Sequence, residues 1–381
     1  MGRRIYLDYN AGAPLDPRVR TAMAPVLGET PGNPSSVHAF GREARVLLEE
    51  ARAGLAALLG AADKDEVVFV SGGTEADNLA VFGVALARAD QGRHVVTSAV
   101  EHPAVLAAAA ALEKAGFTLT VLPVDGEGRL DPADLGRALR PDTVLVSLMH
   151  ANNETGVLFE LPALAAVARA AGVPVHTDAV QSVGKVPVRV DDLGVDLLSL
   201  SGHKIGGPAG SGALYARTGV RLVPRLLGGS QERERRAGTE NLAAAVGLAA
   251  AAHLVAAERG AEAARLADLR DRLEAQVVER IPGAAVNGGG APRVPQTSNL
   301  AFPGVEAEEL LAALDLAGFA CSAGAACSAG ALEPSHVLAA MGLTPERVRG
   351  SIRVSLGRGT TADEVEALAG ALPALVTRCR G

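Results

Sequence analysis

The chain has 381 residues, of which 48% are hydrophobic, and a formal net charge of −7. This length suits two domains with a substantial core, and the acidic balance argues against a nucleic-acid surface, which needs a concentrated basic footprint. Three cysteines without a Cys-x-x-Cys pair argue against a disulfide framework and a structural zinc site, and no secretory apolar segment follows the first arginines, so we expect a soluble cytoplasmic protein.

Short β-rich segments alternate with helical patterns between residues 67 and 216. Such alternation predicts βαβ units around a mainly parallel sheet with helices on both faces, which is an α/β fold. The predicted strands are 67–70, 94–98, 118–122, 143–148, 173–177, 195–200 and 212–216.

The pattern changes after this region. An alanine-rich run at 242–257 predicts a buried or domain-linking helix, because it is shorter than the ~18 apolar residues of a membrane span. Beyond 258 the sequence predicts a smaller α+β domain with an amphipathic helix, strands at 298–302 and 351–356, a helix at 306–317 and a last helix opened by a Thr361/Glu364 capping box. We therefore expect a large domain over 14–257, a small domain over 258–381 together with 1–13, and a ligand cleft between them.

Lysine is scarce in this chain, and Lys204 differs in its setting from the other three. It ends a Ser-Gly-His-Lys sequence at 201–204, directly after an apolar run that predicts a buried strand. A desolvated lysine can act as a nucleophile or base, whereas arginine stays protonated. A Schiff-base role for Lys204 is one hypothesis, and a surface-loop lysine is the alternative.

Polar residues follow several other predicted strands. Gly73 and Thr74 lie between a strand and a helix, where backbone N–H groups and the helix dipole favour an anion, although a capped tight turn has the same pattern. Asp178 ends another strand and, if buried, needs a partner such as a protonated pyridine nitrogen, or else it caps the next segment. His102 and Asn153 fall at the same sheet edge. Polar groups from several strand ends that converge with one lysine predict a binding site there.

The predicted small domain carries two cysteines in a glycine-rich segment, 320–330. Either Cys321 or Cys327 could be an accessible, reactive thiol or an inert core thiol, and the residues alone do not rank them. Cys379, near the end of the chain, is interpreted as incidental. Arg353 interrupts an apolar strand, so it either faces inward to bind a carboxylate or faces solvent.

Together, these residues resemble the cysteine desulfurases of the pyridoxal-phosphate-dependent class V aminotransferase group, specifically those that supply sulfur for iron–sulfur cluster assembly. The likeness covers nearly the whole chain. The motifs that carry it are Gly-Asn-Pro-Ser-Ser at 32–36, Gly-Thr-Glu at 73–75, Glu-His at 101–102, Asn-Asn-Glu at 152–154, Asp178 with Gln181, Ser-Gly-His-Lys at 201–204, Arg-Ala-Gly-Thr-Glu-Asn at 236–241, and Cys327 followed by Leu-Glu-Pro-Ser at 332–335.

The resemblance implies the fold type I of pyridoxal-phosphate-dependent transferases, in which the small domain carries a catalytic cysteine loop that has to travel. It also implies that Lys204 holds pyridoxal 5′-phosphate covalently and moves protons at the substrate Cα. His102 would stack on the cofactor ring, Asp178 would keep the ring nitrogen protonated, and Gln181 would contact the phenolic oxygen.

The remaining roles are carried over in the same way. Gly73, Thr74, Ser201 and His203 would bind the cofactor phosphate, joined by Thr239 from the second subunit of a homodimer. Asn153, which is also a cofactor contact, and Arg353 would orient the substrate carboxylate, with Asn33 as a further candidate. Cys327 aligns with the family nucleophile, which leaves Cys321 as a neighbour.

The implied activity converts L-cysteine to L-alanine and leaves the sulfur as a persulfide on Cys327. A sulfur-acceptor protein such as an iron–sulfur scaffold would receive it, for cluster assembly or tRNA thiolation, and no metal, direct nucleic-acid contact or membrane contact is implied. One alternative is another class V enzyme, either an aminotransferase, which does not need Cys327, or a selenocysteine lyase. A non-catalytic interaction partner is the other alternative, but such a protein would not need Lys204, Asp178 and His102.

Overall fold

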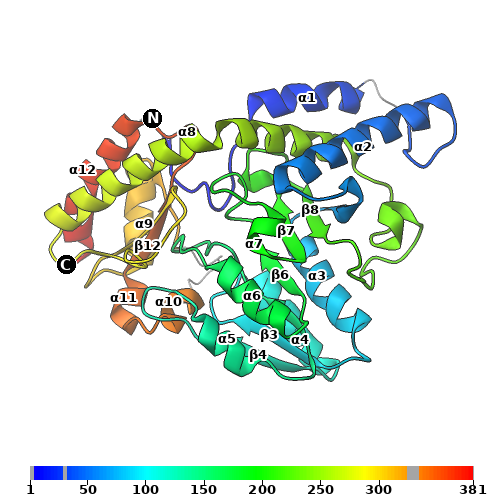
Figure 1. Cartoon of the computed structure of the whole chain (residues 1–381). Coiled ribbons are helices and arrows are strands. Elements are labelled where there is room, and N and C mark those ends of the chain that lie inside the picture. Colours follow the sequence, from blue (N-terminus) through cyan, green and yellow to red (C-terminus); the bar gives the residue numbers. More distant parts are fainter. Residues whose placement is uncertain (1–3, 29–31, 324–333, 381) are drawn as a thin grey trace.

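A computed structural model describes residues 4–28, 32–323 and 334–380 of the chain. Its centre is a seven-stranded sheet in the order β2-β8-β7-β6-β5-β3-β4 (Figure 1). The strands are β2 (Val67–Val70), β3 (His94–Ser98), β4 (Thr118–Leu122), β5 (Thr143–Ser147), β6 (Val175–Asp178), β7 (Leu197–Ser201) and β8 (Gly212–Ala216). All neighbouring pairs are parallel except those that involve β8, so the predicted mainly parallel sheet is confirmed.

The antiparallel direction of β8 follows from the length of its connection. Only the short 3₁₀ turn Gly202–Lys204 and a glycine-rich loop separate β7 from β8. A parallel crossover needs about a dozen residues or more, usually including a helix, so the chain can only turn back on itself here. As a result, the loop that carries Lys204 stays at the carboxyl end of β7.

Helices cover both faces of this sheet (Figure 1). Alternate residues of β2 illustrate why, because Val67 and Phe69 enter one hydrophobic core whereas Val68 and Val70 enter the other. A strand buried on both faces has little need of polar positions, which explains the nearly continuous apolar runs in the sequence. The helices of this part are α3 (Gly73–Ala87), α4 (Pro103–Lys114), α5 (Pro132–Ala138), α6 (Leu161–Ala170) and α7 (Val190–Leu193), with α1 (Pro17–Gly28) and α2 (Ala39–Leu59).

The helix α8 (Leu242–Arg280) connects the two halves of the molecule and runs along both of them (Figure 1). It continues through residues 257 and 258, where the sequence predicts two separate helices, because neither a proline nor a cap interrupts it and a single glycine such as Gly260 costs only about 1 kcal/mol. Among the described helices, α8 has the length and hydropathy of a candidate membrane span, and half of that apolar window is buried inside the structure.

A smaller α+β part, which the sequence predicts, packs on the second half of α8. Its sheet has the order β12-β10-β9 and consists of antiparallel pairs, while β1 pairs in parallel with β11. The elements are β1 (Ile5–Tyr6), β9 (Ala285–Val286), β10 (Thr297–Ala301), α9 (Ala307–Leu316), β11 (Phe319–Ala320), α10 (His336–Ala340), α11 (Pro345–Arg349), β12 (Ser351–Ser355) and α12 (Ala362–Cys379). The capping box of α12 forms between Thr361 and Glu364, as the sequence predicts.

Candidate active site

The carboxyl ends of β2, β3, β5, β6 and β7 meet at a pocket of about 310 Å³ that is closed on its other side by Arg353 of β12. Ten of the residues singled out in the sequence line it: Gly73, Thr74, His102, Asn153, Asp178, Gln181, Ser201, His203, Lys204 and Arg353. The convergence expected of strand ends in an open α/β sheet is therefore present in the structure.

Three sequence candidates do not line this pocket. Asn33 is exposed, and its side-chain oxygen accepts a hydrogen bond from the Ser35 backbone N–H at 2.8 Å. Thr239 lines a separate pocket beside Ser71. Cys327 lies outside the described residues.

Lys204 follows the last residue of β7 in the 3₁₀ turn Gly202–Lys204. Its Nζ donates hydrogen bonds to the backbone carbonyl oxygens of Asn10 and Ala11, the latter at 2.9 Å. Burial, and then the charge of Arg353, lower the pKa of Lys204 to about 8. The amine is thus close to its deprotonated, nucleophilic form near neutral pH, as a covalent role requires.

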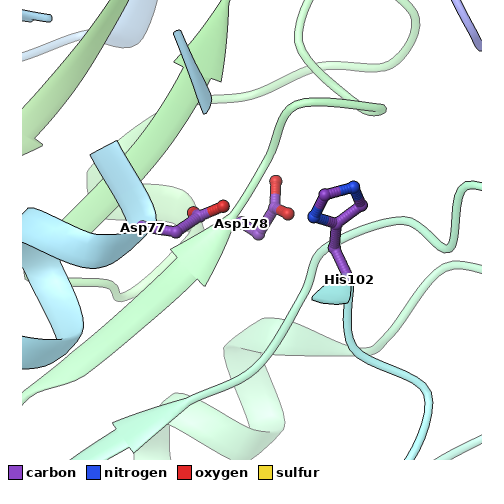
Figure 2. A group of neighbouring side chains, drawn as sticks. All are labelled: Asp77, His102 and Asp178. Atoms are coloured by element: carbon purple, nitrogen blue, oxygen red, sulfur yellow. The ribbon is translucent and has the colours of Figure 1, made fainter. Parts of the chain in front are cut away.

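Asp178 lies between Asp77 and His102, and one polar atom of each lies within 4.8 Å of the others (Figure 2). Asp178 ends β6 and accepts a hydrogen bond from the Val180 backbone N–H at 2.9 Å. Burial raises its pKa, whereas the charges of His102 and Lys204 oppose the shift. His102 caps α4 by accepting the Ala104 N–H on Nδ1 at 3.1 Å, so a neutral ring carries its proton on Nε2.

Asp77 is a member of this site to which the sequence analysis gave no role. It lies in α3, one turn beyond Thr74, and only 1% of its surface is exposed. Its Oδ1 has no hydrogen-bond partner among the described residues. Burial, followed by the charge of Asp178, raises the pKa of Asp77 well above its ordinary value. The sequence feature that could have identified Asp77 is an acidic residue one helical turn after the Gly-Gly-Thr sequence, on the side of α3 that faces the sheet.

One end of the pocket is suited to a phosphate group. Gly73 begins α3, and a Cβ at this position would lie 2.7 Å from the Val180 side chain. The backbone N–H groups at the start of this helix, together with the Thr74 hydroxyl, are donors of the kind that can bind an anion. Ser201 and His203 lie beside them, joined by a 2.8 Å hydrogen bond between Oγ and Nδ1. Burial lowers the pKa of His203 to about 4, so this ring is neutral near pH 7.

The opposite end of the pocket contains Arg353, which is 3% exposed and thus faces inward. Its Nη2 donates to Asp8 at 2.7 Å and its Nη1 donates to the backbone oxygen of Asn153 at 3.0 Å. Its Nε is buried without a hydrogen-bond partner among the described residues. A substrate carboxylate would satisfy this donor, in keeping with the usual pairing of arginine and carboxylate.

These residues fit pyridoxal 5′-phosphate. Asp178 could supply a buried carboxyl for the ring nitrogen, the start of α3 could supply donors for the phosphate, and Lys204 could supply the amine. Gln181 also lines the pocket, and its Nε2 donates to the Asn10 backbone oxygen at 3.0 Å.

The flanks of the segment that contains Cys327 lie beside this pocket. Before it, Ser322 exchanges backbone hydrogen bonds with Arg353 and lines the pocket. After it, the Ser335 hydroxyl donates to Glu154, and the ring of His336 contacts the backbone oxygen of Glu101 at 3.0 Å. The chain thus leaves and rejoins the described structure close to the pocket.

The alternative thiol, Cys321, is packed against the small-domain core. Burial, and then the negative charge of Asp8, raise the pKa of Cys321 to about 12. A thiol with such a pKa is almost wholly protonated at neutral pH and is a poor nucleophile. The choice between the two cysteines, which the residues alone left open, therefore favours Cys327.

Comparisons with known proteins show the family to which the chain belongs. The family described as Aminotransferase class-V matches residues 5–368. The cysteine desulfurase IscS of Dictyoglomus turgidum is 48% identical over 380 residues, which cover 100% of this chain and 96% of the relative. A solved NifS-like protein superposes with a TM-score of 0.92 at 33% identity and covers 98% of this chain and 100% of its own. A structure described as SspA in complex with cysteine has a TM-score of 0.83 at 34% identity. The match covers 92% of this chain and 98% of that structure's chain.

Proposed function

The chain belongs to the class-V aminotransferase family and acts as a pyridoxal-phosphate-dependent cysteine desulfurase, and on this premise we propose which of its residues carry the reaction. The observation on which the proposal rests is the single pocket that contains Lys204, Asp178 and Arg353. These residues respectively supply an amine of lowered pKa, a buried carboxyl and a buried guanidinium with a free donor.

When bound, pyridoxal phosphate supplies an electron sink that makes loss of the substrate Cα proton feasible. Asp178, as a carboxylate, would keep the ring nitrogen protonated, and His102 would lie against the ring. Gly73, Thr74, Ser201 and His203 would hold the phosphate. Lys204, largely deprotonated above its pKa of about 8, accepts the Cα proton of L-cysteine and later returns a proton to the product.

Arg353 and Asn153 orient the carboxylate of L-cysteine. Arg353 is itself held by Asp8 and by the Asn153 backbone, so its guanidinium is fixed before the substrate arrives. A preorganised donor of this kind loses little entropy on binding. The substrate carboxylate therefore sets the direction in which the thiol side chain points.

Cys327 is the sulfur acceptor of the enzyme. Its thiolate attacks the substrate sulfur, an S–S bond forms as the substrate C–S bond breaks, and the carbon retains the bonding electron pair until it is protonated to give L-alanine. Only a thiol can accept a sulfur atom in this way, and the raised pKa of Cys321 makes the neighbouring cysteine unsuitable. The resulting persulfide is passed to an acceptor protein such as an iron–sulfur scaffold.

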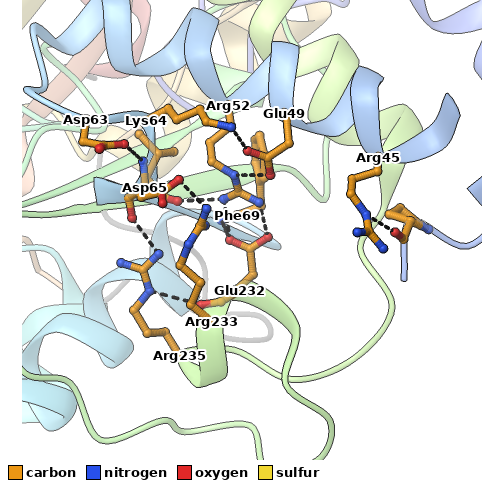
Figure 3. A network of polar contacts seen from close by, with 12 residues as sticks. Arg45, Glu49, Arg52, Asp63, Lys64, Asp65, Phe69, Glu232, Arg233 and Arg235 are labelled. Carbon is orange, nitrogen blue, oxygen red and sulfur yellow. Dashed lines mark hydrogen bonds and ion pairs between the residues drawn. The ribbon is translucent and has the colours of Figure 1, made fainter. Parts of the chain in front are cut away.

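A homodimer is supported by the surroundings of Thr239. Arg236, three residues earlier, bonds to Glu75 of α3 at 2.9 Å. The preceding segment is anchored on α2 by the buried Arg52–Glu232 pair (Figure 3), and it exposes Leu227, with 83% of its surface accessible. A second subunit that covers this apolar surface would receive Thr239 next to its own cofactor phosphate. We place this dimer in the cytoplasm.

The two hydrophobic cores support domain boundaries at 14–257 and 258–381, with 1–13 in the small domain. Leu7 is buried in the small-domain core, whereas Val19 is buried in the large-domain core. Along α8, Val255 belongs to the large-domain core and Leu266 belongs to the small-domain core. This arrangement supports a boundary in α8 between these two side chains.

Alanine release from L-cysteine tests the proposal, with a reductant present to discharge the persulfide. In pyridoxal-phosphate-loaded protein we expect release by the wild type, loss of release in Cys327→Ser with the cofactor still bound, and retention in Cys321→Ser. Release that persists in Cys327→Ser would assign the sulfur transfer to another group. No release from loaded wild type would leave an aminotransferase as the better reading.

A further inference from the structure

A second pocket, of about 360 Å³, lies where α8 passes from the large-domain core to the small-domain core. It shares no lining residue with the pocket of Lys204. One side is a single face of α8, because Val255, Glu258, Glu262 and Leu266 recur at helical spacing. The other walls are the N-terminal segment 13–17, the turns at 184–185 and 205–206, Pro295 and the turn at 358–359.

The carboxylates of this pocket are already paired. Arg18 bonds to Glu258 at 2.6 Å and to Asp16 at 2.8 Å. The side-chain hydrogen bond from Arg18 lowers the pKa of Asp16 to about 2, so this acid is ionised at neutral pH. Glu262 pairs with Arg265 at 2.7 Å. None of the three acids therefore needs a cationic ligand.

Two cations of the pocket have no such partner. The side chains of Lys185 and Arg259 form no hydrogen bond or ion pair with any described residue, and Lys185 is partly buried. Burial lowers the pKa of Lys185 to about 8, although the charge of Glu262 opposes the shift.

The position of Lys185 is set by the glycine before it. Gly184 has φ = +76°, and a Cβ there would lie 3.0 Å from Val255 of α8. The turn therefore lies tightly against α8 and places Lys185 at the wall of the pocket.

We propose that this pocket binds a small amphipathic carboxylate, whose apolar body lies against α8 and whose acid group pairs with Lys185. The volume lies in the range of about 300 to 1,000 Å³ that is usual for small-molecule sites. The apolar part of the wall is made by Pro14, Leu15, Ile205, Val255, Ala263, Leu266 and Pro295. Burial removes water from around the charged amine of Lys185, and a bound carboxylate would replace those favourable interactions. The positive charge of Arg259 would add to the attraction.

Calorimetric titration of the holoenzyme with 4-phenylbutanoate tests this inference, with 4-phenylbutyltrimethylammonium as the comparator of opposite charge, because a quaternary amine cannot condense with the cofactor. We expect one acid bound per chain and at least tenfold weaker binding of the amine. This comparison needs no variant. Equal binding of the two compounds, or no binding of the acid at millimolar concentration, would overturn the inference.

Two variants locate the site. Lys185→Met keeps the length of the side chain but removes its charge, and it should weaken acid binding at least tenfold. Lys114→Met makes the same change at an exposed lysine of α4 and should have no effect. Ala263→Phe places a ring in the pocket and should abolish binding. Wild-type affinity in both Lys185→Met and Ala263→Phe would put the ligand elsewhere.

Discussion

Asp77 and Asp178 present buried carboxyl groups whose oxygen atoms lie within 4.8 Å of each other. Two carboxylates this close in a buried site cannot both be ionised at moderate cost. The charged forms of His102 and Lys204 oppose the rise in the pKa of Asp178, whereas Asp77 lies 3.7 Å from His176. Burial lowers the pKa of His176 to about 3, so His176 is neutral. Asp77 is accordingly the neutral member of the pair.

Asp77→Asn should therefore keep the affinity of the apoenzyme for pyridoxal phosphate near the wild-type value at pH 7, because an amide has the shape and charge of the neutral acid. Asp178→Asn, which removes the charge itself, should weaken binding at least tenfold, or about 1.4 kcal/mol. Titration of each apoprotein with the cofactor measures both effects. Equal losses in the two variants would contradict a neutral Asp77.

The same pair predicts a pH dependence. As the pH rises toward the raised pKa of Asp77, its ionisation should oppose the charge of Asp178 and lower the cofactor affinity of the wild type. Asp77→Asn cannot ionise and should lack this alkaline loss, which a cofactor titration repeated between neutral and alkaline pH would reveal. Parallel curves for the two proteins would assign the loss to another group.

Glu101 should make the folded protein less stable as the pH rises from about 5 to 8. Burial raises its pKa to about 8 from an ordinary 4.5, so the folded state holds a proton that the unfolded state releases. The stability that this proton contributes to the folded state is complete below pH 4.5 and is lost as the pH approaches 8. The free energy of unfolding falls by about 1.4 kcal/mol for each unit of pKa difference between the two states. Melting temperatures against pH should fall less steeply in Glu101→Gln. The exposed control Glu43→Gln should keep the wild-type slope, and identical slopes in all three would contradict the assignment.

Cys321 should be alkylated slowly. With a pKa of about 12, its thiolate fraction at pH 8 is about a thousandfold below that of an ordinary thiol of pKa 8.5. Iodoacetamide labelling of a Cys327→Ser protein, followed by peptide mass mapping, should show Cys321 reacting far more slowly than a small-molecule thiol. Rapid labelling at pH 8 would show that this thiol is not withdrawn from water.

Arg353→Lys should raise the KM for L-cysteine by about 10- to 100-fold and lower kcat less, because a lysine cannot bond Asp8 and Asn153 while also presenting a donor to the carboxylate. Steady-state alanine release measures both constants. A fall confined to kcat would place Arg353 in the chemical step instead.

Arg52→Met should destabilise the fold by about 3–5 kcal/mol, because it leaves Glu232 buried without its cation. Arg52 is bound to both oxygens of Glu232, at 2.7 and 2.8 Å, and both side chains are buried (Figure 3). Arg137→Met removes an exposed ion pair with Asp134 and serves as the control, with an expected cost of at most about 1 kcal/mol. Denaturant unfolding compares the variants, and equal losses would contradict a special role for the buried pair.

Local patterns in the sequence were sufficient to predict the strands of the central sheet, its mainly parallel order and the gathering of Lys204, Asp178 and His102 at one sheet edge, but not the two-residue strands β1, β9 and β11. These features depend on residue spacing and on the rule that parallel strands end on the same side. The continuity of α8 was missed, since the change from an alanine-rich to an amphipathic pattern resembles a boundary although nothing in the backbone ends the helix there.

The sequence by itself determined the fold class and the residue types available for chemistry, because hydrophobic periodicity and strand-end position are local properties. Only the tertiary structure decided that Asp77 lies behind Asp178, that Arg353 faces inward and that Cys321 is unsuited to form a thiolate. Each of these depends on burial and on charges contributed by distant segments. Desolvation and Coulomb interactions act through space, so they become defined only when those segments have packed together.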